Sequence, residues 1–542
     1  MSAYDTIYTT FAHVTQAHPQ RIAISESERS YTFEELSATV DAIAELLMPY
    51  PKRVGVVMHH SATMIAALFA ILKLGAAYVP AEPDFPIKRI AYMMHETDVD
   101  CIVCDRKSAS LLQNLPFRLV VLDDHLQQTP HSHLSFTPVT DPAKQPAYIL
   151  YTSGTTGRPK GITVSNANVC HYARAFAYEF HPHEGDAMLQ YSVCTFDIFV
   201  EEVFASLLNG IRLVIPGKTE HASITALMTF VDKQQITIMS GFPYLFDKMN
   251  GLDHIPSSLR LLISGGDVLR ASYVNHLLNQ ATVYNTYGPS ETTVCTTYYC
   301  CNTGTVLPNG TYPIGKPIQG SQVYLLDTQG HQVPEGKPGE ICILGDGVSL
   351  GYIRHNSREM KAFETLPDGR IMYHSGDMGY YLSDGNIAFM HRMDSQVMID
   401  GKRVELGEVT TQLYQCPGVK QAVVRACKND EGLPYLTAYI VADQLQEASH
   451  SDLINHFANH SIHHATVDFT DHATGQSGNG CVGDSRDDLS PTAPLSLRKL
   501  TAFLAQSLPS YMIPSYFVLV DHIPLTVNGK PNLLQLPIVL KE

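Results

Sequence analysis

The sequence predicts an α/β protein with a large N-terminal domain of mainly parallel α/β sheets, a β-rich subdomain, and a small α+β domain at its C-terminal end. Short apolar runs alternate with helical patterns through about residue 300, and this alternation is typical of parallel strands joined by helices. Residues 312–395 change to short strands separated by turns that contain glycine. The length of 542 residues favours two to four domains.

The first elements follow from local signals. Residues 21–33 hold two short apolar runs on either side of a charged turn, which predicts a hairpin. Thr32 followed by Glu35 forms a capping box and predicts the start of a helix. Residues 54–58 predict a strand, and residues 62–74 predict an apolar helix before the next strand.

The later segments indicate where a ligand binds. Residues 236–240 and 261–264 predict strands that end in loops, and ligands of open α/β sheets bind at the carboxyl ends of strands. A smaller α+β unit follows after about residue 395. Residues 459–494 are polar and rich in His and Gly, which predicts an inserted loop. Its histidines lack the spacing of a known metal motif.

Composition excludes several classes of protein. The net charge is −16, from 53 acidic residues against 37 Lys and Arg, which argues against a nucleic acid partner. No apolar run reaches the ~18 residues of a membrane span, and no signal peptide is visible, so we expect a cytoplasmic protein without a membrane partner. The 11 cysteines suggest reduced thiols, and Cys101 and Cys104 are expected to be strand thiols.

The clearest motif is Tyr-Thr-Ser-Gly-Thr-Thr-Gly-Arg-Pro-Lys-Gly at residues 151–161, directly after the apolar run 147–150. Glycines let the backbone approach a ligand and form an anion-binding nest. Hydroxyl groups donate to phosphate oxygens, and Arg158 and Lys160 add positive charge. The stretch therefore predicts a polyphosphate-binding loop, although it is not a Walker A sequence.

This loop resembles the phosphate loop of the adenylate-forming enzymes, which include acyl-CoA synthetases, luciferases and the adenylation domains of nonribosomal peptide synthetases. Further segments resemble the motifs of this family in the same order, over residues 30–36, 72–80, 285–292, 339–345, 373–377, 392–397, 401–408, 508–514 and 528–530. The resemblance covers roughly residues 5–535 and is to a freestanding adenylation domain, and an excised domain of a larger synthetase is the alternative. It implies a core domain of residues 1–393 and a mobile lid of residues 394–542, with a hinge at Asp394.

The resemblance also implies a nucleotide site. The residues expected to bind ATP are Thr152, Ser153, Gly154, Thr155, Thr156, Gly157, Gly265, Asn285, Thr286, Tyr287, Gly288, Ser290, Asp377 and Arg392. Asp377 is suited to accept both ribose hydroxyls, and Tyr287 offers a ring face to adenine. Glu291 is suited to hold Mg²⁺ on the phosphates, because a hard cation prefers oxygen ligands.

Lys530, Lys160 and Glu291 are the expected catalytic residues. By resemblance, Lys530 contacts the substrate carboxylate and the α-phosphate region. A cation there stabilises the charge that develops as the carboxylate attacks phosphorus and pyrophosphate leaves.

The residues that match the substrate pocket of the family are Asp197, Ile198, Glu201, Ser240, Ile263, Gly265, Thr286, Val294, Cys295 and Lys530. Members that activate amino acids carry an aspartate at the position of Asp197, where it receives the α-ammonium group. On a helix, Asp197 and Glu201 lie on one face, and two carboxylates suit a substrate with two cationic ends. This predicts lysine, ornithine or β-lysine; in the alternative interpretation, Glu201 points to solvent.

Some positions depart from the family pattern. Met398 and Asp400 stand where a Lys and an Arg are usual, His391 replaces a Gly, and Phe389 replaces a Tyr. No carrier domain follows Lys530, so we expect the acceptor to be the phosphopantetheine of a separate carrier protein. The need for a small MbtH-like activator protein stays open. The alternative functions are a D-alanine–carrier protein ligase, and a non-catalytic sensor that binds a nucleotide or an amino acid.

Overall fold

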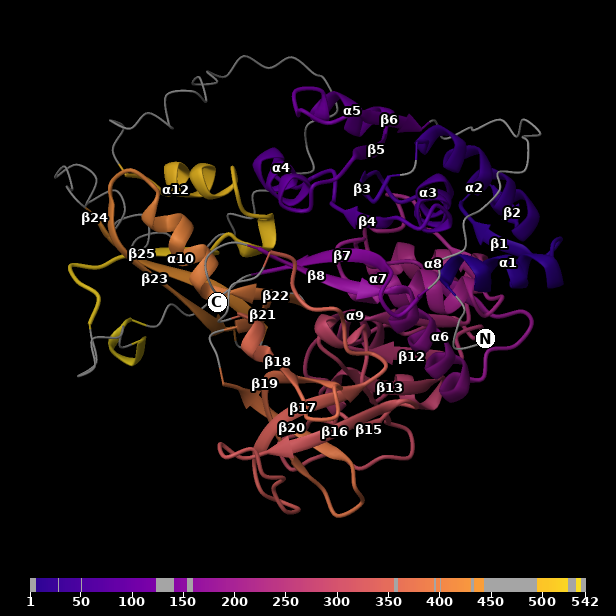
Figure 1. Cartoon of the computed structure of the whole chain (residues 1–542). Helices are drawn as coiled ribbons and strands as arrows, with labels where there is room; N and C mark the ends of the chain where they lie inside the picture. Colours follow the sequence, from indigo (N-terminus) through magenta and orange to yellow (C-terminus); the bar gives the residue numbers. More distant parts are fainter. Residues whose placement is uncertain are drawn as a thin grey trace. The chain divides into compact units, whose positions relative to one another are not determined.

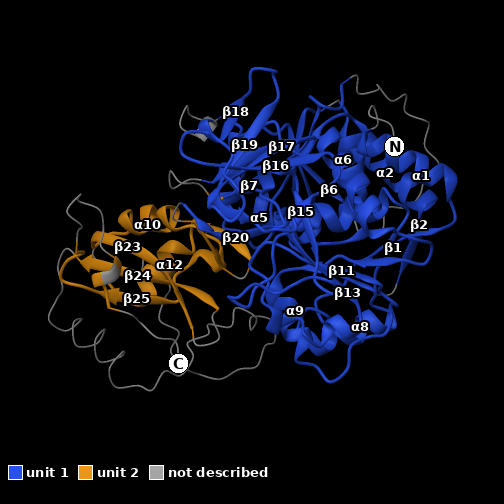
Figure 2. Cartoon of the chain, turned by 90° about the horizontal axis from the view of Figure 1, so that it is seen from below, with its two compact units in different colours: residues 1–152, 159–394 blue, residues 153–158, 395–542 orange. Residues whose placement is uncertain are grey.

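The computed structural model describes residues 6–27, 29–49, 51–122, 141–153, 159–354, 359–393, 396–399, 401–429, 433–442, 495–524 and 533–537. The chain divides into two compact units (Figure 2), of which unit 1 comprises residues 1–152 and 159–394 and unit 2 comprises residues 153–158 and 395–542. The sequence predicted a division one residue earlier, before Asp394. Asp394 itself and the predicted inserted loop 459–494 lie outside the described residues.

The first sheet of unit 1 is built from apolar parallel strands with helical connections (Figure 1). Its order is β6-β5-β3-β4-β7-β8, with all neighbours parallel except β7 and β8. The strands are β3 (Arg53–Val57), β4 (Ala77–Pro80), β5 (Cys101–Asp105), β6 (Leu119–Leu122), β7 (Pro146–Thr152) and β8 (Lys160–Ser165). The helices nearby in sequence are α2 (Phe33–Leu47), α3 (Ala62–Lys73), α4 (Ile87–Glu96) and α5 (Arg106–Leu112).

Local signals account for several of these elements. Thr32 caps α2, since its side chain accepts from the Glu35 N–H while the Glu35 carboxylate accepts from the Thr32 N–H. Every residue of α3 is buried, as its mostly apolar sequence predicted, and Lys73 at its end is paired with Asp41. Cys101 and Cys104 are buried in β5, which confirms the prediction of strand thiols.

The second sheet of unit 1 carries the strand ends that matter for function. Its order is β15-β14-β13-β12-β11-β9-β10-β1-β2, and the run from β13 to β1 is parallel. The strands are β1 (Ile22–Ser25), β2 (Ser30–Thr32), β9 (Ala187–Leu189), β10 (Arg212–Val214), β11 (Ile238–Gly241), β12 (Leu261–Ser264), β13 (Thr282–Tyr287), β14 (Thr297–Cys300) and β15 (Lys316–Pro317). The predicted hairpin is β1 with β2, and the predicted strand 236–240 begins at Ile238 instead.

The helices of this part of the chain are α1 (Ile7–Ala17), α6 (Asn166–Phe180), α7 (Asp197–Val200), α8 (Ile224–Lys233) and α9 (Pro243–Asn250). A π-helix, η1 (Glu201–Ala205), continues directly from α7. One large apolar core joins both sheets through Phe33, Phe69, Phe176 and Phe204.

The β-rich part predicted for residues 312–395 is present as a five-stranded antiparallel sheet. Its strands are β16 (Ser321–Leu326), β17 (Gly339–Gly345), β18 (Phe363–Thr365), β19 (Ile371–Tyr381) and β20 (Ile387–Arg392). The pairing of β17 with β19 shifts register between Glu340 and Cys342, and Gly376 adopts a left-handed φ of 73° at this irregularity.

Unit 2 is a small α+β unit, as the sequence predicted. Its described elements are β21 (Gln396–Ile399), β22 (Lys402–Glu405), α10 (Leu406–Tyr414), β23 (Val419–Lys428), β24 (Pro434–Ala442), α12 (Leu497–Leu504) and β25 (Tyr516–Leu519). Its core gathers Val409, Leu413, Leu436 and Leu500. Across the described parts of both units, none of the helices has the length and apolar character needed to cross a membrane.

Candidate active site

Asp197 is held at the first turn of α7, close to the motif that follows β13. Its Oδ2 accepts a hydrogen bond from the Ser290 hydroxyl at 2.5 Å. Burial raises the pKa of Asp197 to about 6; the Ser290 hydrogen bond opposes this shift, and the charge of Glu291 adds to it. The structure thus brings together two residues predicted from separate motifs and leaves a buried carboxylate with little compensation.

Glu201 lies one helical turn after Asp197, at the point where α7 becomes the π-helix. Its side chain is buried, with only 1% of the residue exposed, so the alternative interpretation of a solvated Glu201 is wrong. The Tyr172 hydroxyl of α6 donates to its Oε2, whereas Oε1 has no hydrogen-bond partner among the described residues. Burial raises the pKa of Glu201 to about 7, and the Asp197 charge contributes to the increase.

Glu202, the next residue, is a second buried carboxylate, and burial raises its pKa to about 8. It is equally buried, yet its carboxylate accepts from the Ser192 N–H and hydroxyl and from the Gln190 amide, at 2.9 to 3.1 Å. Both oxygens of Glu202 therefore accept hydrogen bonds, while one oxygen of Glu201 has no partner among the described residues.

The other predicted pocket residues come from the ends of adjacent parallel strands. Ser240 lies in β11, Ile263 in β12 and Thr286 in β13, and all three are buried. The Thr286 hydroxyl donates to the Ser264 carbonyl at 3.1 Å, and the Ser240 hydroxyl donates to the Ile263 carbonyl at 3.5 Å. The hydroxyl of Ser240 also opposes the rise in the Glu201 pKa.

Two glycines and a strained turn shape the same region. A Cβ on Gly265 would lie 2.8 Å from the Thr286 hydroxyl, and a Cβ on Gly288 would lie 2.4 Å from the Val294 carbonyl. Val294 itself adopts a left-handed φ of 68°, which is costly for a β-branched residue. Cys295 follows it, buried, with a pKa raised well above the usual range by burial and then by Glu201. Ile198 is also buried.

Among the residues expected to bind ATP, Asp377 of β19 accepts hydrogen bonds at both carboxylate oxygens. Its Oδ1 accepts from Arg392 Nη1 at 2.6 Å, and its Oδ2 accepts from the Tyr287 hydroxyl at 2.7 Å. Arg392 Nη2 also donates to the Ser375 carbonyl at 3.1 Å. Three residues predicted from three separate motifs are therefore in contact.

Glu291 and Lys160 meet at Tyr352. The Tyr352 hydroxyl donates to Glu291 Oε1 at 2.7 Å, and Lys160 Nζ lies 5.6 Å from the centroid of the Tyr352 ring. Sequence reasoning missed both Tyr352 and Tyr172, because a tyrosine in an apolar segment carries no signal of a partner 61 or 29 residues away.

The remaining predicted residues fall into two groups. Thr152 ends β7, and Asn285 in β13 donates to the Pro313 carbonyl at 2.8 Å. Ser153 belongs to unit 2, where its hydroxyl donates to the Arg403 carbonyl at 3.0 Å. Gly154, Thr155, Thr156, Gly157 and Lys530 lie outside the described residues.

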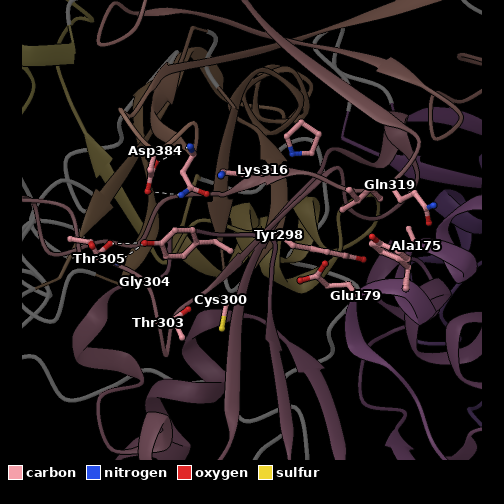
Figure 3. A pocket seen from close by; sticks show the side chains of 15 residues that line it. Ala175, Glu179, Tyr298, Cys300, Thr303, Gly304, Thr305, Lys316, Gln319 and Asp384 are labelled. Atoms are coloured by element: carbon pink, nitrogen blue, oxygen red, sulfur yellow. Dashed lines mark hydrogen bonds between the residues drawn. The ribbon is translucent and has the colours of Figure 1, made fainter.

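A separate pocket of about 580 Å³ lies in unit 1 beside β14 and β15 (Figure 3). Its lining includes Glu179, Tyr298, Lys316 and Asp384, and Asp384 is bonded to Asn386. None of the predicted site residues that the structure describes lines this pocket. It is therefore a different place from the carboxylate pair.

Comparisons with known proteins show the family. The model of the AMP-binding enzyme family matches residues 11–353. The chain is 33% identical over 537 residues to bacitracin synthase 2 of Bacillus licheniformis, covering 98% of the chain but 18% of that protein. Thus the chain spans less than a fifth of the length of this curated relative.

Solved structures of adenylation proteins have the same fold. A protein of nonribosomal peptide synthesis that contains adenylation and PCP domains is 25% identical, with a TM-score of 0.75 over 98% of this chain and 84% of that one. An adenylation domain of Vibrio cholerae, solved with glycyl-adenosine-5'-phosphate, has a TM-score of 0.78 at 21% identity over 98% and 97% of the two chains.

Proposed function

The chain belongs to the AMP-binding enzymes, and we propose that it uses ATP to activate a basic amino acid, namely lysine, ornithine or β-lysine. The products would be an aminoacyl adenylate and pyrophosphate, and the aminoacyl group would then pass to the phosphopantetheine thiol of a separate carrier protein. The observation that carries the choice of substrate is the buried Glu201 with one unpaired oxygen, one turn from Asp197.

The argument for a basic side chain is one of charge balance. A buried carboxylate without a partner is costly, and removing one partner of a buried ion pair costs roughly 3–5 kcal/mol. An α-ammonium group at Asp197 and a side-chain ammonium at Glu201 would pair both groups. A neutral side chain would leave Glu201 unpaired, so the pocket rejects it, and D-alanine is disfavoured for the same reason.

The residues of the chain then take separate parts in the two steps. In the first step, a carboxylate oxygen of the amino acid bonds to the α-phosphorus while the bond to pyrophosphate breaks. Asp377 would hold the ribose hydroxyls, and Lys160 would lie toward the phosphates. In the second step, the carrier thiolate bonds to the carbonyl carbon and AMP leaves. Lys530 is proposed as the cation of the first step, by its resemblance to the family motif.

Glu291 fits a role in holding Mg²⁺. Its carboxylate is buried beside the Asp197 carboxylate, whose pKa it raises, so a divalent cation would relieve two negative charges at once. When bound, the ion would neutralise charge on the phosphates. Tyr352 orients the carboxylate through Oε1.

The test is amino-acid-dependent exchange of pyrophosphate into ATP. We would compare lysine, ornithine, β-lysine and D-alanine with norleucine, which matches lysine but lacks the side-chain ammonium. Wild type is expected to prefer lysine or ornithine over norleucine by about a hundredfold or more. Glu201→Gln should abolish this preference. Glu202→Gln is the matched control, because Glu202 is equally buried but already satisfied, and it should keep the preference.

Other outcomes decide against the proposal. Exchange with D-alanine that Glu201→Gln leaves unchanged would favour a D-alanine–carrier protein ligase. Exchange with none of these amino acids, while ATP still binds, would favour a sensor without catalysis.

A further inference from the structure

We propose that Glu340, Cys342 and His374 bind a divalent transition-metal ion, and that zinc is the ion this ligand set fits best. The three side chains lie on the five-stranded sheet of unit 1, and nothing in the proposed reaction uses them. Thiolate, imidazole and carboxylate are the three ligand types of protein zinc sites.

The strand register brings these residues together. Cys342 of β17 lies directly opposite His374 of β19, and Glu340 precedes Cys342 by two residues on the same strand. Ile341 and Ile343 belong to the main core, whereas Cys342 packs in a small cluster with Leu344 and Met372. The site therefore occupies the face of the sheet that turns away from the main core.

The distances suit one ion between the three ligands. His374 Nδ1 lies 3.3 Å from Cys342 Sγ and 3.3 Å from Glu340 Oε2, and all three atoms lie within 4.8 Å of one another. A tetrahedral zinc site with bonds of ~2.1 Å to nitrogen or oxygen and ~2.3 Å to sulfur separates its ligands by about 3.4–3.6 Å. Small movements of the side chains would complete the geometry, with the fourth position left to water.

The surrounding groups support the ligands in the way that metal sites require. Glu340 uses Oε1 to accept from the Gly376 N–H at 3.0 Å, and so presents Oε2 to the site. His374 Nε2 lies 3.0 Å from Glu364 Oε2, which would fix the imidazole with Nδ1 directed at the metal. A carboxylate that orients a histidine ligand in this way is a common outer partner of zinc.

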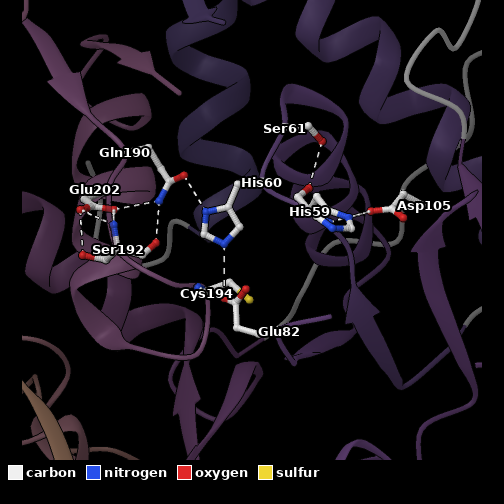
Figure 4. A network of polar contacts seen from close by, with 9 residues as sticks. All are labelled: His59, His60, Ser61, Glu82, Asp105, Gln190, Ser192, Cys194 and Glu202. Atoms are coloured by element: carbon white, nitrogen blue, oxygen red, sulfur yellow. Dashed lines mark hydrogen bonds and ion pairs between the residues drawn. The ribbon is translucent and has the colours of Figure 1, made fainter. Parts of the chain in front are cut away.

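A second cluster shows what a poor candidate looks like. His60, Glu82 and Cys194 also lie close together (Figure 4), but Glu82 Oε1 already accepts from the Cys194 N–H at 2.6 Å and contacts His60 Nε2 at 3.3 Å. An ion there would displace a buried backbone hydrogen bond, which is costly. In the proposed site, Glu340 accepts from the Gly376 N–H through Oε1, so this hydrogen bond can remain when Oε2 binds the ion.

Cobalt(II) provides the test, because a cobalt–thiolate bond gives an intense ultraviolet charge-transfer band. The full-length protein, stripped of metal with a chelator, would be titrated with Co²⁺ and then with Zn²⁺. We expect a charge-transfer band that zinc displaces, at one equivalent. Cys342→Ser should lose the band, and Glu364→Gln should keep it with affinity lowered ~10–100-fold.

Two matched variants separate this site from the other thiols. Cys194→Ser removes the sulfur of the second cluster, and Cys481→Ser removes the cysteine within the histidine-rich segment 459–494; both should retain the band. Circular dichroism would establish that Cys342→Ser folds, and His374→Gln would serve in its place if it does not. Absence of the band in wild type, or its survival in both Cys342→Ser and His374→Gln, would overturn the proposal.

Discussion

The carboxylates of the proposed amino-acid pocket and the carboxylate of the proposed nucleotide site have opposite kinds of partner. Asp377 is neutralised by the Arg392 guanidinium and also accepts from the Tyr287 hydroxyl. Asp197 receives one hydroxyl, and Glu201 keeps an oxygen without a partner among the described residues. A carboxylate already paired with a cation is suited to accept from neutral hydroxyls such as those of ribose. Two buried carboxylates that have hydroxyl partners but no cationic partner among the described residues are suited to bind cations.

Asp197→Ala should have the largest effect on activity. It removes the group proposed to receive the α-ammonium, and the loss of one partner of a buried charge pair costs roughly 3–5 kcal/mol, or about a hundredfold to several thousandfold in kcat/KM for the amino acid. Pyrophosphate exchange measures this. Ser290→Ala, which removes only the hydroxyl that donates to Asp197, should cost about tenfold. Equal losses in both variants would contradict the proposed role.

Glu201→Gln should change the pH dependence of stability. The folded chain raises the pKa of Glu201 from 4.5 to about 7, so between these values it holds more protons than the unfolded chain. The stability of wild type therefore falls as pH rises through this window, by roughly 3 kcal/mol from this group. The variant should lack this part of the decline and should be the more stable protein at pH 8.

Urea denaturation at several pH values from 4 to 8 would measure this difference. Glu335→Gln, at an exposed position, is the control and should follow wild type. Parallel stability curves for wild type and Glu201→Gln would contradict the raised pKa of Glu201.

Arg392→Lys should have an intermediate effect, confined to the nucleotide side. The guanidinium donates to Asp377 and to the Ser375 carbonyl at once, and a lysine ammonium cannot reproduce this planar pair of bonds. A loss of about 1.5–3 kcal/mol would raise KM for ATP roughly tenfold to a hundredfold. The preference for lysine over norleucine should not change. A shift in that preference would show that the two sides are not independent.

Tyr287→Phe should have the smallest effect. It removes one hydrogen bond to Asp377, but the Arg392 bond remains. The expected change in KM for ATP is about fivefold to tenfold, corresponding to ~1 kcal/mol. Pyrophosphate exchange at varied ATP concentration would measure it. A loss as large as that of Arg392→Lys would indicate that the hydroxyl has a further role.

Much of the fold could be predicted because local signals and global packing agree. A capping box at Thr32 predicted the start of α2, and a mostly apolar run predicted the buried helix α3. Turns that contain glycine predicted the β-rich part after residue 312. The adenylate-forming fold inferred from the ordered motifs is confirmed by the family match and by the solved structures.

The side-chain partners could not be predicted. Tyr172 and Tyr352 are buried aromatic residues whose hydroxyls reach carboxylates far away in sequence. Likewise, the sequence placed Asp197 and Glu201 on one helical face, but the change to a π-helix at Glu201 depends on packing against α6 and has no local signal. Partners of this kind are set by tertiary contacts that periodicity does not record.

The π-helix at Glu201–Ala205 also affects how this segment of the chain is anchored. A π-turn amounts to one residue inserted into an α-helix, and the backbone on either side returns to ordinary helical pairing, as residues 206 and 207 do here. Phe199 and Leu207 lie on either side of the π-helix and are buried in the core. The segment that carries Glu201 is therefore held by apolar packing at both ends, so a polar substitution at Glu201 would change the charge beside Asp197 without removing either of these apolar contacts.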